Sequence, residues 1–178
     1  MEACGRAYEY LGKKPVLGSG VFIDPGARVM GEVVLGERVA VLFGAVVRGT
    51  NDRVEVGDES VILEHALVEA PAGRPVRVGR RVLISHGAIV HGAVVEDESL
   101  IGIGARVLDG AVVGRGSIVA AGAVVPPGKR VPPGTIVVGV PAKPLRPVSR
   151  EDLERAKEEL EAVHAQIPGY RRALGCEG

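Results

Sequence analysis

Aliphatic residues recur every six positions through about two-thirds of this chain, and that spacing constrains its fold more than any other feature. From Ile23 to Val137, 19 successive positions hold only Ile, Val or Leu, and 15 of the 18 intervals between them are six residues long. The position four residues after each is mostly Ala, Ser or Val. Such a hexapeptide repeat predicts a parallel β-helix, in which the aliphatic side chain fills the interior and the small one fits the corner.

The repeat divides the 178 residues into three parts. We expect residues 1–22 to form an N-terminal lead-in, residues 23–140 a left-handed β-helix, and residues 141–178 a linker, marked by Pro141 and Pro144, with a C-terminal helix. The predicted fold class is therefore all-β with one α-helix. Three hexapeptides make one triangular coil, which predicts roughly six coils stacked about 4.8 Å apart. Nearly all known helices of this type wind left-handed, against the usual crossover rule.

Apolar residues at helical spacing predict a helix over residues 150–166. Ser149 and Asp152 match an N-terminal capping box, and Pro168 with Gly169 predicts the end of the helix. We expect this helix to pack along the outside of the solenoid or against a neighbouring subunit.

Composition excludes several classes of function. The net charge is zero and the basic residues form no dense cluster, so neither nucleic acid nor a membrane is an expected partner. The chain begins without a signal-peptide pattern and contains no apolar stretch of about 18 residues, so we expect a cytoplasmic protein. Asn51 and Gln166 are the only amides, a bias typical of thermophiles. Cys4 and Cys176 lie at opposite ends, and we expect two unrelated thiols.

Three intervals depart from the six-residue step, and irregular positions in a regular sequence are where function is expected. The irregular intervals run from Val47 to Val56 (nine residues), from Val68 to Val78 (ten) and from Val90 to Val95 (five). A shortened interval is the least ordinary of these, because the loss of one residue disturbs the pairing of a strand.

The repeat also predicts which side chains stack. Taking every third interior position places one outward-facing column at Arg48, Glu69 and His91, in successive coils. Glu69 and His91 are then close enough to share a ligand. His86 falls on a different face, above Glu64, so it does not meet His91 within one chain. In a three-fold trimer, His86 of one chain meets Glu69 and His91 of its neighbour.

With these residues the chain resembles the γ-class carbonic anhydrase family, which consists of trimeric left-handed β-helices with zinc or iron at the subunit interface. The resemblance covers almost the whole length, and the family includes proteins named ferripyochelin-binding protein. It rests on Gly12-Lys13-Lys14-Pro15, Arg48-Gly49, Ile84-Ser85-His86, Val90-His91-Gly92, Ala121-Gly122-Ala123-Val124-Val125-Pro126-Pro127 and Gly139-Val140-Pro141-Ala142-Lys143. The two histidines five residues apart are its most specific part, whereas the last segment is shared with hexapeptide acyltransferases.

The resemblance implies a metal site. In that family three His residues bind the metal; His86 and His91 match two of them, and Glu69 stands at the third. Two imidazoles and one carboxylate are an accepted ligand set for catalytic zinc. The implied protein is a homotrimer that holds Zn²⁺, or Fe²⁺ or Co²⁺, between subunits. His65, near a corner of the adjacent coil, is an alternative ligand.

Other positions depart from the family pattern. Its Arg-Gly-Asp reads Arg48-Gly49-Thr50 here, and its water-orienting Gln-Asp pair falls on Leu63-Glu64. The resemblance therefore implies catalytic roles for Arg48 and Glu64, and Asp52 is a candidate replacement partner for Arg48. Because Leu63 offers no polar group and Glu69 adds negative charge, we expect weak or absent hydration of carbon dioxide.

Three functions stay open at this point. The first is a carbonic anhydrase-like metalloprotein, a lyase with an altered active site, acting on CO₂, bicarbonate or another small carbonyl compound. The second is a hexapeptide acyltransferase that uses acetyl-CoA, with His86 or His91 as general base. The third is a non-catalytic trimeric scaffold without metal, in which Arg48 and Glu69 form an ion pair and His91 donates a hydrogen bond to it.

Overall fold

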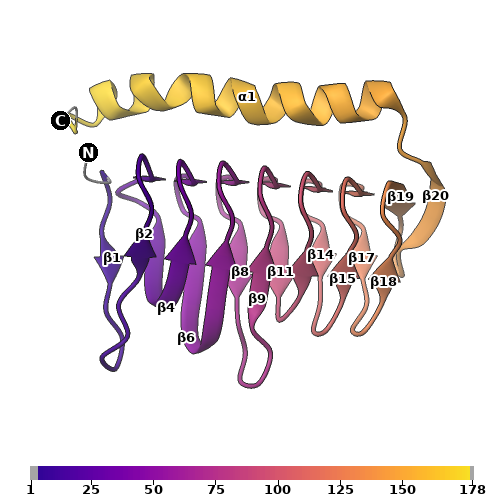
Figure 1. The fold of residues 1–178 in the computed structure, drawn as a ribbon, viewed down its shortest axis with the longest axis horizontal. Coiled ribbons are helices and arrows are strands. Elements are labelled where there is room, and N and C mark those ends of the chain that lie inside the picture. The colour runs from indigo at the N-terminus through magenta and orange to yellow at the C-terminus, as the bar shows by residue number, and fades with distance from the viewer. Residues whose placement is uncertain (1–3, 177–178) are drawn as a thin grey trace.

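Short parallel strands stack from one coil to the next and form a left-handed β-helix of about seven turns, with one long helix beside it (Figure 1). The computed structural model describes residues 4–176, and it confirms the predicted fold class. The elements are β1 (Ala7–Tyr8), β2 (Val16–Leu17), β3 (Phe22–Ile23), β4 (Arg28–Leu35), β5 (Ala40–Val41), β6 (Val46–Val56), β7 (Val61–Ile62), β8 (Leu67–Glu69), β9 (Val76–Val78), β10 (Leu83–Ile84), β11 (Ile89–His91), β12 (Val94–Val95), β13 (Leu100–Ile101), β14 (Arg106–Val107), β15 (Val112–Val113), β16 (Ile118–Val119), β17 (Val124–Val125), β18 (Arg130–Val131), β19 (Thr135–Val138), β20 (Lys143–Pro147) and α1 (Arg150–Ala173).

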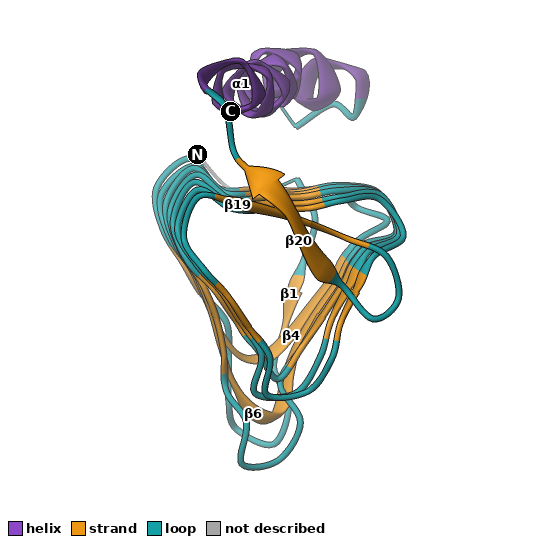
Figure 2. Ribbon diagram, turned by 90° about the vertical axis from the view of Figure 1, so that its right-hand side faces the viewer, coloured by secondary structure: helices purple, strands orange, loops and turns teal. Residues whose placement is uncertain are grey.

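The strands form the three faces of a triangular prism, seen end-on in Figure 2. One sheet makes the face beneath α1, in the order β20-β19-β16-β13-β10-β7-β5-β3. The other sheet runs β17-β14-β11-β8-β6-β9-β12-β15-β18, with β1, β2 and β4 attached, and it bends along β4 and β6 so that its two wings form the remaining faces. The three corners are therefore distinct, and the corner at β6 lies farthest from α1 (Figure 2).

Both ends of the solenoid contain more regular structure than the repeat predicts. Before Ile23, β1 and β2 pair in parallel with β4, which accounts for about seven turns rather than roughly six. After the last coil, part of the expected linker forms β20, which pairs antiparallel with β19. Leu17 of β2 stands six residues before Ile23 and pairs with the interior residue Leu35, so the six-residue step already begins before Ile23, whereas β20 has no aliphatic residue at that step.

The aliphatic side chains of the repeat fill the interior of the solenoid. All 19 aliphatic positions of the series are at most 3% exposed. Val47, Val68 and Val90 are paired in successive coils, as the spacing predicts. Complete burial of a Val or Ile side chain contributes about 1.5–3 kcal/mol relative to exposure. This continuous aliphatic stack fixes the register, because a slip of one residue would turn every interior side chain outward.

Helix α1 covers one face of the prism through a second apolar cluster, composed of Phe22, Ala40, Leu42, Val61, Leu63, Leu83 and Leu160. The predicted capping box of Ser149 and Asp152 is present at its start. A hydrogen bond from Arg146 holds the pKa of Asp152 below its ordinary value. The predicted end at Pro168 is wrong, since the helix continues to Ala173. Tyr170 stacks on Phe22 beyond the proline (ring centroids 6.0 Å apart), and this packing offsets the lost backbone hydrogen bond.

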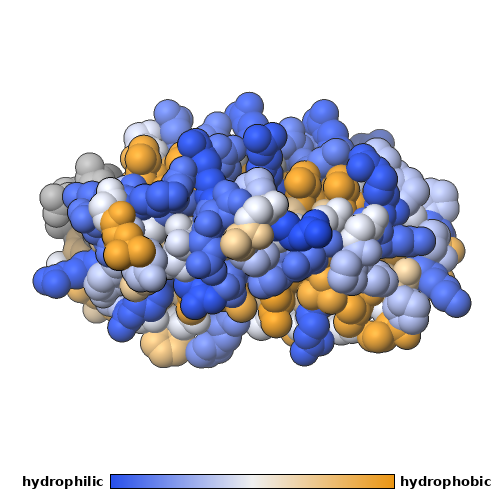
Figure 3. All heavy atoms as spheres, turned by 90° about the horizontal axis from the view of Figure 1, so that it is seen from below, coloured by the Kyte–Doolittle hydropathy of each residue, from blue (hydrophilic) through white to orange (hydrophobic). Residues whose placement is uncertain are grey.

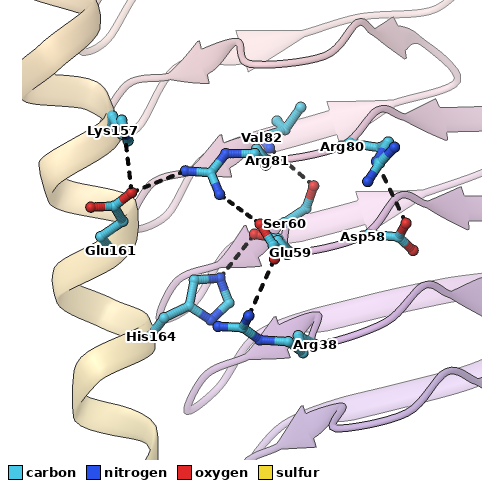
Figure 4. Close-up of polar contacts among 10 residues, drawn as sticks. All are labelled: Arg38, Asp58, Glu59, Ser60, Arg80, Arg81, Val82, Lys157, Glu161 and His164. Atoms are coloured by element: carbon cyan, nitrogen blue, oxygen red, sulfur yellow. Dashed lines mark hydrogen bonds and ion pairs between the residues drawn. The ribbon is translucent and has the colours of Figure 1, made fainter.

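Polar contacts also fasten α1 to the solenoid (Figure 4). Glu59 forms ion pairs with Arg38 and Arg81, and the hydrogen bond from Arg81 lowers the pKa of Glu59. Arg81 reaches onward to Glu161 of the helix (3.3 Å), and His164 Nε2 lies 2.9 Å from the backbone oxygen of Glu59. The middle of the helix is thus held by the contacts of Glu161 and His164, its start by the ion pair of Asp152 with Arg146 of β20, and its far end by the aromatic stack of Tyr170. Within residues 4–176, no helix is both long and apolar enough to span a membrane.

The expectation of two unrelated thiols is wrong, because Cys4 and Cys176 form a disulfide. Helix α1 runs back along the whole solenoid and brings the C-terminal end to the first coil (Figure 1). The two Cα atoms are 5.4 Å apart, although the residues are separated by 172 positions in sequence. The bridge closes the chain into one loop and fastens the end of α1 to the N-terminal segment.

Reduction of this disulfide is expected to lower the free energy of unfolding by about 2–4 kcal/mol, because the bridge restricts the unfolded chain more than the folded one. Denaturant midpoints measured with and without a phosphine reductant test this. A Cys4→Ser, Cys176→Ser double variant serves as the control and should not respond to the reductant. Equal midpoints for the oxidised and reduced wild type would contradict the expectation.

Candidate functional site

The register of β6, β8 and β11 places Arg48, Glu69 and His91 in the predicted outward column. The guanidinium of Arg48 forms an ion pair with the carboxylate of Glu69, whose side chain is only 12% exposed. Asp52, the candidate partner for Arg48, instead accepts a hydrogen bond from the backbone N–H of Arg53 (2.7 Å). Glu69 is therefore the carboxylate that faces Arg48, and His91 lies one strand away, about 4.8 Å along the stack.

His86 and Glu64 occupy another corner of the prism. Their side chains lie in adjacent coils, with His86 Nε2 3.0 Å from Glu64 Oε2. That contact lacks the alignment of a hydrogen bond, and among the described residues the buried Oε2 atom has no hydrogen-bond partner. The imidazole of His86 is more than half exposed. This corner thus presents an accessible imidazole beside a carboxylate oxygen with an unused electron pair.

Within one chain, the corner that carries Glu69 and His91 and the corner that carries His86 remain apart. Within residues 4–176, no three His, Cys, Asp or Glu side chains form a group able to hold a metal ion. Glu69 and His91 are adjacent, whereas His86 lies on the other corner. His65 has a left-handed backbone (φ +61°), and its ring packs edge-on against Phe43 of the preceding coil, with centroids 5.5 Å apart. His86 lies in the following coil.

Two residues that the sequence analysis did not consider contact this site. Nδ1 of His91 lies against a carboxylate oxygen of Asp109, in the next coil. Arg74 Nε lies 3.8 Å from the other oxygen of Asp109. The hydrogen bond with His91 is the main cause that holds the pKa of Asp109 below its ordinary value, and the charge of Arg74 makes a smaller contribution in the same direction. Asp109 follows His91 by 18 residues, one complete coil, so the repeat offered a signal for it; Arg74 lies in an irregular loop and had none.

The ten-residue and five-residue intervals pack against each other at Gly92. Gly92 has a left-handed backbone (φ +56°), and a Cβ atom there would lie 3.1 Å from both Pro71 and Arg74. The longer interval thus forms a loop that folds over the next coil, and the shorter interval leaves room for it. Two of the three irregular intervals therefore form one local structure. The longer of them places Arg74 near His91.

Charges alternate along this corner of the prism. Positive Arg48 meets negative Glu69, and negative Asp109 lies between His91 and positive Arg74. Figure 3 views the molecule from the side opposite α1, where hydrophilic side chains predominate and apolar ones form separate patches. Glu69 and His91 are neighbouring electron-pair donors in successive coils, which suits them to share a cation.

Comparisons with known proteins identify relatives over most of the chain. Residues 14–49 and 92–127 match the family model described as bacterial transferase hexapeptide (six repeats). A carbonic anhydrase from Geobacillus kaustophilus is 36% identical over 94% of this chain and 91% of its own length. A probable carbonic anhydrase from Methanocaldococcus jannaschii is 40% identical over 80% and 90%, respectively. The chain spans about half (53%) of the mitochondrial gamma carbonic anhydrase 2 of Arabidopsis thaliana, which is 35% identical over 79% of this chain.

Solved structures show the same fold. A hexapeptide transferase family protein from Anaplasma phagocytophilum superposes with a TM-score of 0.87 and is 32% identical in sequence. The superposition includes 92% of this chain and 97% of that protein's chain. PerB from Caulobacter crescentus, solved with CoA and GDP-perosamine, superposes with a TM-score of 0.54 and is 30% identical in sequence. That superposition includes 71% of this chain and 57% of the PerB chain.

Replacing Gly92 with Ala is expected to destabilise the protein by about 1 kcal/mol more than the same change at Gly128. Both glycines have left-handed backbones (φ +56° and +69°), so both variants pay the conformational cost. Only at Gly92 does the new methyl group meet the loop, because a Cβ at Gly128 has no neighbour within 4 Å. Urea unfolding of both variants measures the difference, and equal destabilisation would show that the loop does not pack on Gly92.

Proposed function

Because the chain belongs to the γ-class carbonic anhydrase-like family of hexapeptide-repeat proteins, we propose that it forms a homotrimer with a metal site between subunits. The site uses Glu69 and His91 of one subunit and His86 of the next, and it takes Zn²⁺, or alternatively Fe²⁺ or Co²⁺. One observation carries this proposal: β8 and β11 set Glu69 beside His91, while His86 lies at another corner and is more than half exposed.

The donor set fits a divalent transition metal. Two imidazoles and one carboxylate are a recognised catalytic ligand set that leaves one coordination position open. The corner of His86 also has an unused acceptor, since Glu64 Oε2 is buried and lacks a hydrogen bond among the described residues. An acceptor left in this state is costly unless a donor or cation approaches it. A neighbouring subunit at this corner is one source of such a group.

Exposed apolar side chains support burial of the same corner in an interface. Phe43, Glu64, His86 and Ile103 follow one another in successive coils, as the backbone hydrogen bonds of this corner show. Phe43 is 56% exposed and Ile103 is 61% exposed. Large apolar side chains on either side of a polar pair are typical of an interaction surface. Contact between this corner and the Arg48 corner of another copy is heterologous, and three such contacts close a ring.

A metal ion at this site supplies Lewis acidity that activates water for addition to a carbonyl carbon. The residues of the chain set the remaining conditions. Arg48 fixes the carboxylate of Glu69, and Glu64 beside His86 is placed to accept a proton. Glu69 brings negative charge where the family has a neutral imidazole, and Leu63 is buried beneath α1 and offers no polar group. We therefore propose weak or absent reversible hydration of CO₂, with another small carbonyl compound as the alternative substrate.

Subunit mixing tests the shared site. His86→Ala and His91→Ala are each expected to abolish zinc binding in the trimer, because each variant lacks one ligand at every interface. An equimolar mixture refolded together should regain zinc at about a quarter of the sites, where an intact His91 meets an intact His86. Zinc per subunit is measured by elemental analysis after gel filtration, and His65→Ala should retain full occupancy.

Two results would contradict this proposal. Zinc retained by either single variant would place the metal elsewhere, and loss of zinc in His65→Ala would favour the alternative ligand. A wild-type trimer that takes up neither zinc, cobalt nor anaerobic iron would leave acyl transfer or the non-catalytic scaffold as the function.

A second candidate is acyl transfer from acetyl-CoA. The match to the transferase hexapeptide model and the similarity to a transferase family structure and to the CoA-bound PerB structure favour it. His86 or His91 would then act as general base. A thermal-shift titration with CoA separates the two candidates, because a ligand that binds the folded state raises the melting temperature in proportion to the logarithm of its concentration. We expect no shift with CoA; a dose-dependent rise would favour acyl transfer.

A further inference from the structure

We infer that Asp109, braced by Arg74, is a positioning residue that keeps a proton on Nδ1 of His91 and leaves Nε2 as the nitrogen with an available electron pair. The role of Nε2 as a metal ligand rests on the proposed function. The orientation of the ring does not, because Asp109, Arg74 and His91 belong to the same chain and are in contact within it.

The backbone at Asp109 is held from both sides. Its carbonyl oxygen accepts a hydrogen bond from Gly128 of the following coil (2.9 Å). The next residue, Gly110, donates its N–H to the carbonyl oxygen of Gly92 in the preceding coil (2.7 Å). His91 and Asp109 are therefore carried by adjacent coils with fixed spacing, and the carboxylate has a defined position beside the ring.

The direction of the hydrogen bond follows from the chemistry of the carboxylate. An aspartate is ionised at neutral pH and can only accept hydrogen bonds, so Nδ1 of His91 must carry the hydrogen. If the ring is neutral, Nε2 has the lone pair; if the ring is protonated, Nε2 is the nitrogen that releases its proton. A neutral His91 then has no second N–H to donate to the Arg48–Glu69 pair. This argues against the scaffold hypothesis in the form given above, in which His91 donates a hydrogen bond to that pair.

Arg74 limits the freedom of Asp109. A Cβ atom at Gly110 would lie only 2.9 Å from a guanidinium nitrogen of Arg74, so the guanidinium lies directly over that glycine. From there its Nε reaches the second carboxylate oxygen of Asp109 at 3.8 Å. An exposed ion pair of this kind contributes little to stability. Its effect is to keep the other carboxylate oxygen directed at His91, and this gives the ten-residue interval a function.

A carboxylate that holds one ring nitrogen and frees the other is a common support for metal-binding histidines, and its loss typically weakens metal binding about 10- to 100-fold. A carboxylate that only stabilised the corner would leave the ring tautomer unchanged when replaced. The tautomer therefore distinguishes positioning from a purely structural role, and it can be read in metal-free protein.

The experiment compares wild type, Asp109→Ala and Asp58→Ala by nitrogen-15 NMR of histidine-labelled, metal-free protein at about pH 8, where an ordinary His is neutral. His91→Gln assigns the His91 signals. Asp58 is the matched control, because its side chain is as exposed as that of Asp109 (39% and 37%) and lies beside Arg80, not beside His91. Asp109→Leu, which likewise offers no acceptor to Nδ1, serves as the second variant if the alanine variant fails to fold.

The inference predicts a Nδ1–H tautomer for His91 in the wild type and in Asp58→Ala. In Asp109→Ala the ring should shift towards the Nε2–H form that imidazole favours in water, and zinc should bind about 10- to 100-fold more weakly. Unchanged His91 signals in both Asp109 variants would overturn the inference even if zinc binds at His91. A wild-type protein that binds no zinc but shows the predicted tautomer shift would instead contradict only the proposed function.

Discussion

Every other feature of this molecule depends on the stacking of aliphatic side chains in the solenoid interior. Because each interior Val, Ile or Leu lies directly on its counterpart in the next coil, the outward-facing residues beside them are also aligned. Residues about 20 positions apart in sequence thus become neighbours without any loop to bring them together. Arg48, Glu69 and His91 form one such column, and Glu64 with His86 belongs to another. The candidate functional side chains are therefore carried on the outside of a regular aliphatic core.

The irregular intervals modify this regular surface at one corner. The loop after Glu69 adds residues, the turn at Gly92 loses one, and the two pack together. The result is that Arg74, from a loop outside the repeat, joins Asp109 on one side of His91, with Glu69 on the other. A regular hexapeptide solenoid presents the same environment in every coil. Here the departures from the repeat make the environment of one histidine different from all others.

Features that follow from regular spacing along the chain could be predicted from the sequence, whereas features that depend on tertiary packing could not. The fold class, the capping box, the Arg48 column and the stacking of His86 above Glu64 follow from counting residues. The Cys4–Cys176 bridge was missed because it depends on the return path of α1, and the continuation past Pro168 depends on packing against Phe22. Arg74 lies in a loop without a period. Whether His86 meets His91 depends on a second copy of the chain, which no single-chain pattern can place.

The central claim is that the metal centre is divided between subunits, and native mass spectrometry tests it most directly. Zinc-loaded protein should appear as three chains with three zinc ions, and gentle dissociation into monomers should release the metal, because no single chain retains more than two of the ligands. Monomers that keep one zinc each would contradict the account, since they would locate a complete site within one chain. Trimers that carry no zinc after reconstitution would contradict it equally.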